Sequence, residues 1–474
     1  MVRTTPADLV IGVDSSTQST KALLVDAATG RVVDRAGAPH PDGTAVDPGA
    51  WLTAFDTATA DLLGRASAIS VAGQQHGMVA LDADDRPVHD ALLWNDTRSA
   101  SAAADLVDEL GGPAVCAATV GSVLVASFTS TKLRWLRDHE PDAAARVRRV
   151  LLPHDHVSRH VAGGDPFTDR GDASGTGYFS TPDDRWRPDL AEMALGHAVE
   201  LPRLVASHDP AATSPDGLVV AAGTGDNAGA ALGLDLQPGD VVLSIGTSGV
   251  ASAISSTPVV DPTGAVTGFA DATGHFLPLV ATMNAARILQ LQANLLGVDH
   301  DELARLALAA PPGAHGLTVL PYYAGERTPN RPDATGTWSG LTTSTSREDV
   351  ARAAVEALLC SLADAVDHLV AAGGPEPGRI LMIGGGAQNP AVQQIAPAVL
   401  GRPVVVPDPD EYVARGAARQ AAWAWSGDVT PPAWPEVSSR TFEADPTPDV
   451  RAAYARLRHD DPSSPHHLGR EARP

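Results

Sequence analysis

Cysteine and basic residues are scarce in this 474-residue sequence. There are two cysteines, Cys116 and Cys360, and neither lies in a spacing typical of a metal site. A disulfide framework is therefore excluded, and a reducing compartment such as the cytoplasm is expected. Lysine and arginine number 34 against 57 aspartates and glutamates, which gives a formal net charge of −23 and a pI of about 4.9. Such a charge argues against nucleic acid or an anionic membrane as a partner, because both attract a basic surface.

Long apolar runs are also absent. No stretch of about 18 apolar residues occurs, so we expect no membrane-spanning helix. The first residues, Met1–Pro6, lack the apolar core of a signal peptide. Hydrophobic residues make up 43% of the chain and aromatic residues 4%, so the cores should consist mainly of alanine, valine and leucine. A chain of 474 residues is too long for one ordinary core, and two domains are expected.

Lysine occurs only at Lys21 and Lys132, and arginine supplies the remaining basic charge. A genome biased toward arginine codons would retain lysine mainly where it is needed, although chance survival explains the pattern equally well. Lys21 closes a short polar turn, where a compact ammonium differs from a planar guanidinium.

The chain begins with a pattern of three short strands. Residues 9–14, 21–25 and 31–34 are separated by turns and predict an antiparallel meander. The first turn contains hydroxyl groups, the carboxylate of Asp14 and the ammonium of Lys21. Amides and hydroxyls in such a turn can hold phosphate oxygens, and a carboxylate at a strand end can bind Mg²⁺ directly or through water. A solvated hairpin tip is the alternative.

A glycine-flanked stretch, Gly73–Met78, lies where two predicted strands meet. Gln75 and His76 can both hydrogen-bond hydroxyl groups, and Gly77 permits close approach to the backbone. This pattern predicts a clamp for a polyol. A histidine that is satisfied within its own turn is the alternative.

Trp94 adjoins Asn95 and Asp96 ahead of a predicted helix. An apolar ring beside an amide and a carboxylate is a combination that suits sugars. A core tryptophan at the start of a capped helix explains the same residues equally well.

Two later segments also carry carboxylates. Residues 167–176 form a long polar stretch that predicts a lid over a site or a solvated connection, and we favour the lid. The turn Gly223–Gly225 precedes a helix at Asp226, which is either a helix N-cap, a functional carboxylate or both. Because a helix N-terminus favours the ionised form, we expect Asp226 to be charged and weakly basic.

The strand–turn–strand pattern of residues 10–22 recurs at residues 241–251. This recurrence predicts an internal duplication, with the turn Gly246–Gly249 as a second grip on phosphate. A glycine-rich turn at residues 384–389 joins a predicted strand to a helix, where a ligand can lie against bare backbone.

Two helices have recognisable signals. Ser346–Asp349 predicts a capping box at the start of a long helix that runs to about residue 372. Residues 414–425 predict a further helix, in which Gly416 permits close packing against a neighbour.

Seven motifs follow one another in an order that resembles the FGGY family of carbohydrate kinases, and within it the xylulokinase branch. Each motif alone is weak, whereas together they cover nearly the whole chain, roughly residues 8–425. The seven are Asp14–Lys21, Gly73–Gly77, Leu93–Asp96, Gly223–Asn227, Ser244–Gly249, Gly325–Pro329 and Gly384–Asn389.

The resemblance implies an α/β fold of two actin-like ATPase (RNase H-like) domains, with ATP and sugar in the cleft between them. It assigns residues 1–235 to a sugar-binding domain, 236–440 to a nucleotide-binding domain, and 441–474 to a helix and a disordered tail. The implied activity is transfer of phosphate from ATP to D-xylulose, giving D-xylulose 5-phosphate, with a homodimer as the implied assembly.

The resemblance also implies roles for single residues. Asp226 would accept the proton of the sugar hydroxyl, and Asp14 would organise Mg²⁺ and the γ-phosphate. The residues implied for the ketopentose are Gln75, His76, Gly77, Trp94, Asn95, Asp96, Asp226 and Asn227. Those implied for phosphate are Thr17, Lys21, Gly246, Thr247, Ser248 and Gly249, and those for the adenine nucleoside are Gly384, Gly385, Gly386 and Asn389.

Two residues depart from the family's usual pattern. Ser16 stands where the family usually has glycine, and Gln75 stands where xylulokinases often carry methionine. A ribulose, a deoxyketose, gluconate or a pentitol is therefore an alternative acceptor. A non-catalytic regulator that binds nucleotide or sugar, and a nuclease on the same core, are further alternatives. The presence of both Asp14 and Asp226 disfavours the regulator, and the acidic charge disfavours the nuclease.

Overall fold

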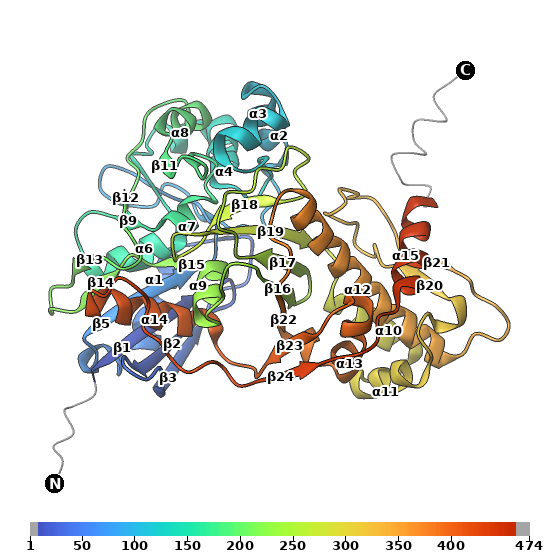
Figure 1. The fold of residues 1–474 in the computed structure, drawn as a ribbon. Coiled ribbons are helices and arrows are strands. Elements are labelled where there is room, and N and C mark those ends of the chain that lie inside the picture. The colour runs from blue at the N-terminus through green and yellow to red at the C-terminus, as the bar shows by residue number, and fades with distance from the viewer. Residues whose placement is uncertain (1–7, 461–474) are drawn as a thin grey trace, which may run out of the picture. The chain divides into compact units, whose positions relative to one another are not determined.

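The computed structural model describes residues 8–460, which form two compact units (Figure 1). Unit 1 comprises residues 8–236, Ser256–Leu277 and Asp410–Glu436, and unit 2 comprises Gln237–Ser255, Pro278–Pro409 and residues 437–460. Within residues 8–460, no helix has the length and apolar character needed to cross a membrane. The part of the predicted tail at residues 461–474 lies outside the described residues.

Unit 1 is built around a mixed β-sheet with the strand order β13-β14-β5-β1-β2-β3. Its strands are β1 (Leu9–Ser15), β2 (Ser19–Asp26), β3 (Val32–Pro39), β5 (Ala68–Gly73), β13 (Pro210–Thr213) and β14 (Val219–Ala221), and β15 (Thr224–Gly225) also pairs with β5. Strands β1, β2 and β3 are antiparallel neighbours, which confirms the predicted meander. Strand β5 runs parallel to β1 on its other side.

Strand β1 is buried on both faces of this sheet, and its successive side chains point to opposite sides. Ile11 and Val13 pack with Trp51 and Phe55 of helix α1 (Gly49–Thr59) in one core. Val10 belongs to a second core with alanines of helix α14 (Tyr412–Ser426). Figure 1 shows α14 beside β1 although it comes from the far end of the chain.

Helix α14 also packs closely against helix α9 (Asp226–Gly233). A Cβ atom at Gly416 would lie 1.8 Å from the carbonyl oxygen of Gly229. A Cβ atom at Gly12 of β1 would lie 2.0 Å from the carbonyl oxygen of Ala414. The predicted close packing at Gly416 is therefore confirmed, and α14 fixes α9 against the sheet.

The remaining elements of unit 1 surround this centre. The helices are α2 (Ala100–Glu109), α3 (Pro113–Val120), α4 (Thr129–His139), α5 (Pro141–Ala144), α6 (Pro153–Ala162), α7 (Arg170–Ala173) and α8 (Pro188–Leu195). The short strands are β4 (Ala45–Val46), β6 (Val79–Leu81), β7 (Ala91–Leu92), β8 (Arg149–Leu151), β9 (Phe167–Thr168), β10 (Phe179–Ser180), β11 (Arg185–Trp186), β12 (Arg203–Leu204) and β18 (Thr267–Ala270). Nearly every residue of the polar stretch 167–176 is buried, so the alternative of a solvated connection is wrong, while the lid stays a prediction.

Unit 2 contains a second sheet, with the order β19-β17-β16-β22-β23-β24. These strands are β16 (Asp240–Ile245), β17 (Gly249–Ala253), β19 (Phe276–Thr282), β22 (Arg379–Ile383), β23 (Val404–Pro407) and β24 (Ser439–Phe442). Strand β16 pairs antiparallel with β17 and parallel with β22, as β1 does with β2 and β5. The predicted recurrence of the hairpin is confirmed.

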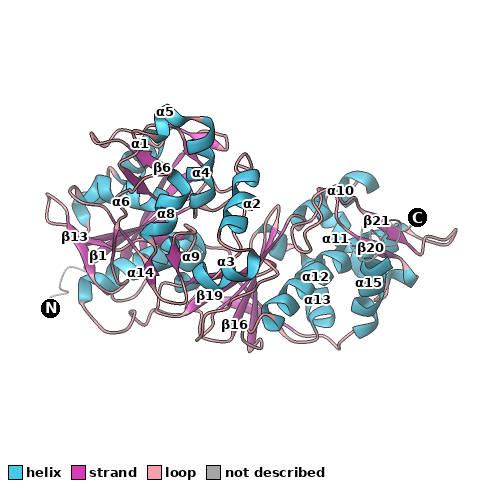
Figure 2. Cartoon of the chain, turned by 90° about the horizontal axis from the view of Figure 1, so that it is seen from above, coloured by secondary structure: helices cyan, strands magenta, loops and turns pink. Residues whose placement is uncertain are grey.

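Helices make up most of the rest of unit 2 (Figure 2). They are α10 (Ala286–Leu296), α11 (His300–Ala309), α12 (Arg347–Ala371), α13 (Pro390–Leu400) and α15 (Pro448–Asp460), with the strands β20 (Thr318–Leu320) and β21 (Thr337–Ser339). Ser346 and Asp349 form the predicted capping box of α12. The predicted domains are continuous in sequence, whereas Ser256–Leu277 and Asp410–Glu436, which were assigned to the second domain, belong to unit 1.

Replacing Gly416 by alanine should destabilise unit 1, because the added methyl group meets backbone atoms of α9 that cannot move independently. We expect a loss of about 1–3 kcal/mol in the free energy of unfolding, measured by urea denaturation. Gly64→Ala is the matched control, since Gly64 is exposed and a Cβ atom there has no neighbour within 4 Å. Equal stability of the two variants would contradict the packing described above.

Candidate functional site

Asp14 lies near the end of β1 and is 6% exposed. Its Oδ1 accepts a hydrogen bond from the hydroxyl of Ser16 at 2.7 Å. Lys21 stands opposite Asp14 in the β1–β2 ladder, and its ammonium donates to Glu411 at 2.8 Å. Burial raises the pKa of Asp14 to about 6, against the opposing effects of Ser16 and Lys21. Ser16, one of the two residues that depart from the family pattern, thus contacts the predicted metal-binding carboxylate.

Asp226 is the first residue of α9, and the N-cap position belongs to Gly225. Oδ1 of Asp226 accepts hydrogen bonds from the backbone N–H of Asn227 at 2.7 Å and from its side-chain amide at 2.9 Å. The alternative that Asp226 acts as the N-cap of the helix is therefore wrong. Its carboxylate is held by the next residue of the chain instead.

The environment of Asp226 is more unfavourable for a negative charge than we predicted from the helix terminus. Burial, followed by the carboxylates of Asp14 and Asp172, raises its pKa to about 7, while the N–H of Asn227 acts in the opposite direction. A helix N-terminus contributes about 0.3–1 kcal/mol, which is less than one pKa unit of about 1.4 kcal/mol. The prediction of a weakly basic Asp226 is therefore wrong.

Gln75 is linked to Asp226 through one side chain. The amide of Asn227 donates to Oε1 of Gln75 at 2.8 Å while it also donates to Asp226. Strand β15 pairs in parallel with the end of β5 and places Gly225 beside Gly73. A Cβ atom at Gly225 would lie 2.8 Å from Cγ of Gln75, so only glycine lets the two segments approach this closely. Three of the predicted site residues therefore form one hydrogen-bonded group.

His76 adopts a left-handed backbone conformation, with φ of 69°. Its Nδ1 lies 2.9 Å from the carbonyl oxygen of Gly175 and must donate to it, because a carbonyl only accepts. In the neutral ring, Nε2 is then the acceptor. The imidazole stacks on Phe128 at 5.4 Å between ring centroids and contacts Phe269 at 5.3 Å. The predicted clamp histidine is thus fixed by three separate segments.

Lys132 supports the loop that leads to Phe128. The side chain is fully buried, and its ammonium donates to the carbonyl oxygens of Ala126 and Ser127, each at 2.7 Å. Burial lowers the pKa of Lys132 to about 7. A compact ammonium with several donors fits this position, which gives Lys132 a structural reason to be lysine.

The remaining residues predicted to bind sugar differ in their surroundings. Trp94 is 41% exposed, and its Nε1 donates to the hydroxyl of Thr17 in the first hairpin at 3.0 Å. Asn95 is exposed. Gly77 is closely packed, because a Cβ atom there would lie 2.6 Å from Cγ of Pro153. Both oxygens of Asp96 accept protein donors, one from Thr44 and one from Arg98. Although burial acts to raise it, these bonds hold the pKa of Asp96 below its usual value.

Several residues that surround this group were missed in the sequence. The amide of Gln420 on α14 donates to the carbonyl oxygen of Gly223 at 2.8 Å, just before the turn that carries Asp226. Gln420 is fully buried among alanines, and a lone amide in an apolar helix face is a usable signal. Phe128 and Phe269 come from distant segments and carried no such local signal, whereas Asp172 lies in the polar stretch 167–176.

Unit 2 contains a cavity of about 460 Å³ at the start of helices α10 and α13. Its lining includes Thr247, Gly385, Gly386 and Asn389 from the predicted set, together with Ala286, Arg287, Leu289, Gln290, His300, Asp301, Gln388 and Pro390. No atom lies within 4 Å of a Cβ position at Gly385, so the backbone is open there. The oxygen of Asn389 accepts N–H groups of Ala391 and Val392, which makes this residue the N-cap of α13.

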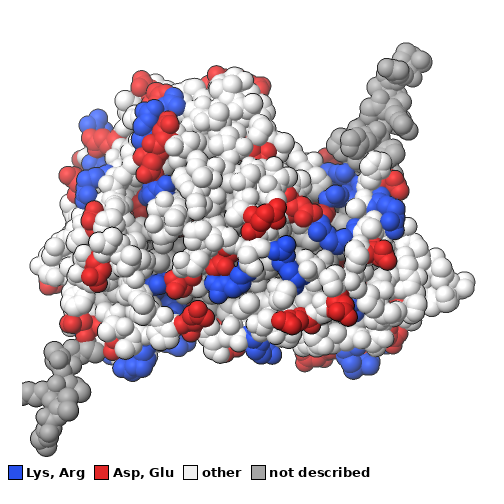
Figure 3. Space-filling model, in the orientation of Figure 1, with Lys and Arg blue, Asp and Glu red and all other residues white. Residues whose placement is uncertain are grey.

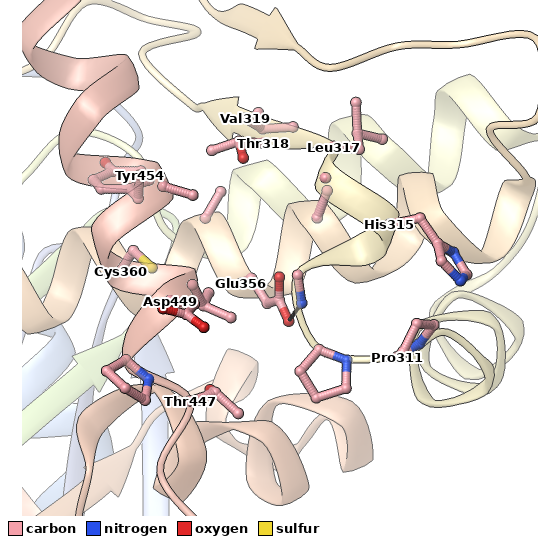
Figure 4. A pocket seen from close by; sticks show the side chains of 18 of the residues that line it. Pro311, His315, Leu317, Thr318, Val319, Glu356, Cys360, Thr447, Asp449 and Tyr454 are labelled. Carbon is pink, nitrogen blue, oxygen red and sulfur yellow. Dashed lines mark hydrogen bonds between the residues drawn. The ribbon is translucent and has the colours of Figure 1, made fainter.

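Three glycines of the predicted set in unit 2 are closely packed. Cβ atoms at Gly384 and Gly386 would meet Ile245 at 2.8 and 2.4 Å, so both glycines are required by packing. A Cβ atom at Gly249 would lie 2.7 Å from Thr282. A different cavity of about 520 Å³ lies beside α12 and α15 and is lined by Glu356, Cys360 and Tyr454 among others (Figure 4). It contains none of the predicted binding residues.

Comparison with known proteins identifies relatives of this chain in both sequence and structure. Models of the FGGY family of carbohydrate kinases match residues 9–233 (N-terminal domain) and 241–425 (C-terminal domain). The xylulose kinase of Streptomyces coelicolor is 47% identical over 436 residues, which is 89% of each chain. That of Streptomyces rubiginosus is 44% identical over the same length and coverage. The crystal structure of xylulose kinase from Bifidobacterium adolescentis has a TM-score of 0.90 and 44% identity, and the match covers 96% of this chain and 100% of that one.

These matches span both units and confirm the predicted fold of two actin-like domains. They also agree with the order of the motifs, from the hairpin at Asp14 to the glycine-rich turn at Gly384. The chain is a sugar kinase and belongs to the FGGY family of carbohydrate kinases.

Proposed function

We propose that this enzyme transfers the γ-phosphoryl group of ATP to the O5 hydroxyl of D-xylulose. The observation that carries the proposal is the hydrogen-bonded group of Asp226, Asn227 and Gln75, which places a carboxyl with a pKa of about 7 beside amide groups that can bind hydroxyls. The relatives with 44% and 47% identity are named xylulose kinases, which supports this acceptor.

In the proposed reaction, Asp226 orients the attacking hydroxyl and accepts its proton. Phosphoryl transfer passes through a loose transition state, so positioning and electrostatics provide most of the acceleration. Oε1 of Gln75 already accepts from Asn227, so Nε2 is the donor that Gln75 can offer to a sugar oxygen. Nε2 of His76 can accept from a sugar hydroxyl, because Nδ1 donates to Gly175. Gly77, Trp94, Asn95 and Asp96 complete the proposed sugar site.

We further propose that Asp14 holds Mg²⁺, directly or through water. Mg²⁺ is usually bound by one or two carboxylates together with water and substrate phosphates, and the buried carboxylate of Asp14 fits such a role. Within residues 8–460, no three or more His, Cys, Asp or Glu side chains are arranged so that they could hold a metal ion by themselves. When bound, the metal would neutralise charge on the phosphates.

ATP is proposed to bind unit 2, with its adenine nucleoside at Gly384, Gly385, Gly386 and Asn389. The cavity of about 460 Å³ and the open backbone at Gly385 support this assignment, and Arg287 adds a positive charge to its lining. The proposed phosphate contacts are Thr17, Lys21, Gly246, Thr247, Ser248 and Gly249. Lys21 uses one ammonium donor for Glu411, and an ammonium carries three.

Other features bear on the alternatives and on location. Acidic and basic side chains are interspersed on the face seen in Figure 3, without the broad basic area that a nuclease would need. We infer a cytoplasmic location, because the reaction consumes ATP and both cysteines are unpaired. The homodimer remains a prediction.

A panel of acceptors tests the proposed function directly. ADP release from Mg-ATP should be fastest with D-xylulose, compared with D-ribulose, L-ribulose, gluconate, glycerol and water alone, in a coupled assay. Preference for another polyol would retain the kinase mechanism and place the error at Gln75. ADP release that is absent, or independent of sugar, would contradict the proposal and favour the regulator.

Replacing Asp226 by asparagine should lower kcat by roughly 10²- to 10⁴-fold, because the amide cannot accept the proton. The shape of the side chain is kept, so circular dichroism and the melting temperature should change little. Asp216→Asn is the matched control, since Asp216 is exposed in the same unit and should leave kcat unchanged. Near-normal turnover of Asp226→Asn would remove this residue from the mechanism.

The rate should also depend on pH near neutrality. Asp226 must be deprotonated to act as a base, and its pKa is raised to about 7, so protonation removes the active form as pH falls. We expect kcat/KM for the preferred sugar to fall about tenfold per pH unit below the pKa and to level off above it. A profile that stays flat through this range in wild-type enzyme would show that the carboxyl does not titrate there.

A further inference from the structure

A buried ion pair lies directly behind the proposed sugar site. Nδ1 of His154, on α6, is 2.6 Å from Oδ2 of Asp172, on α7, and both side chains are fully buried. Asp155 and Asp169 also face the imidazole, with oxygens 3.2 and 3.8 Å from Nε2. None of the seven motifs includes this cluster, although Asp169 and Asp172 lie in the polar stretch 167–176.

His154 touches the two segments that carry the proposed catalytic and sugar-binding residues. A Cβ atom at Gly73 would lie 2.9 Å from both Cβ and the backbone nitrogen of His154. A Cβ atom at Gly223 would lie 2.4 Å from Cδ2 of the imidazole ring. Gly73 ends the strand that leads to Gln75, and Gly223 opens the turn that leads to Asp226.

Asp172 is connected to the third element of the site. The N–H of Gly175 donates to the carbonyl oxygen of Asp172 at 3.0 Å, and the carbonyl oxygen of Gly175 accepts from Nδ1 of His76. A Cβ atom at Gly175 would lie 2.2 Å from this same Nδ1. The position of the His76 ring therefore depends on where the segment after α7 lies.

We propose that His154 and Asp172 form a positioning pair that locks the base-bearing turn and the sugar-contacting histidine into one geometry. The pair joins α6 to α7. Helix α6 packs against the segments at Gly73 and Gly223, and α7 fixes the position of Gly175. This inference rests on the proposed function, because it assigns the pair to the same sugar site. Its consequence is that an ion pair without contact to substrate controls turnover.

The charges around the pair support this role. Although burial opposes it, Asp155, Asp172 and Asp169 raise the pKa of His154 to about 9, so the imidazole is protonated at neutral pH. Oδ1 of Asp172 is buried and has no hydrogen-bond partner within the described residues. The buried Tyr178 also faces Asp155 and Asp172. The negative charge of Asp172 acts on Asp226, as does that of Asp14, and both raise the pKa of Asp226.

The test is Asp172→Asn, which keeps the shape of the side chain and removes its charge. With the sugar that wild-type enzyme prefers, kcat should fall about 10- to 100-fold, because small misplacement of reacting groups is costly. KM for ATP should stay the same. The acidic limb of the pH profile should move to lower pH, because one of the charges that raise the pKa of Asp226 is gone. A residue that serves only stability would not move this limb.

Asp56→Asn is the matched control. It weakens a pair of the same chemistry on the same helix, where Nε2 of His160 lies 2.8 Å from Oδ1 of Asp56 at the exposed side. Kinetic constants and pH profile should remain those of wild type. If Asp172→Asn does not fold, the double variant His154→Gln/Asp172→Asn replaces the ion pair by a neutral hydrogen-bonded pair and should show the same fall in kcat.

Two results separate this inference from the proposed function. Wild-type enzyme that phosphorylates no sugar would overturn the proposed function, and the inference would fall with it. Active wild-type enzyme combined with folded variants whose kcat lies within twofold of wild type, and whose acidic limb does not move, would overturn the positioning pair alone.

Discussion

Burial of carboxylates at one end of the unit 1 sheet is the constraint on which the rest of the site depends. Burial raises the pKa of Asp14, Asp172 and Asp226, and the first two raise that of Asp226 further. A buried carboxylate costs free energy unless hydrogen bonds or cations compensate for lost water. A hydroxyl, an imidazole and an amide supply these contacts. As a result, the pKa of Asp226 lies near neutral pH, which is the range that suits a general base.

Close backbone packing holds these carboxylates in place. Helix α14 meets the sheet at Gly12 and α9 at Gly416, where a single added carbon would collide with backbone atoms. The same helix provides Gln420, which binds the carbonyl oxygen of Gly223. Interiors packed to this density transmit small displacements, so the geometry at Asp226 depends on the packing of α14 against the sheet and α9.

The two sheets repeat one pairing pattern with different chemistry at the hairpin. In unit 1 the penultimate pair of the β1–β2 ladder is Asp14 with Lys21. In unit 2 the corresponding pair of the β16–β17 ladder is Ser244 with Val250, which carries no charge. The charged hairpin suits a metal and a migrating phosphoryl group. Thr247 lies in the turn of the neutral hairpin and lines the cavity proposed for the nucleotide.

The sequence by itself determined the elements and their order. The meander at residues 9–39, the capping box at Ser346 and the close packing at Gly416 follow from local patterns, because alternation, capping and glycine act over a few residues. It also indicated the group of Gln75, Asn227 and Asp226 through the motifs that carry them. Tertiary structure alone decided the ionisation of Asp226 and the burial of residues 167–176. Desolvation and charge repulsion depend on which distant segments meet, and no local pattern records that.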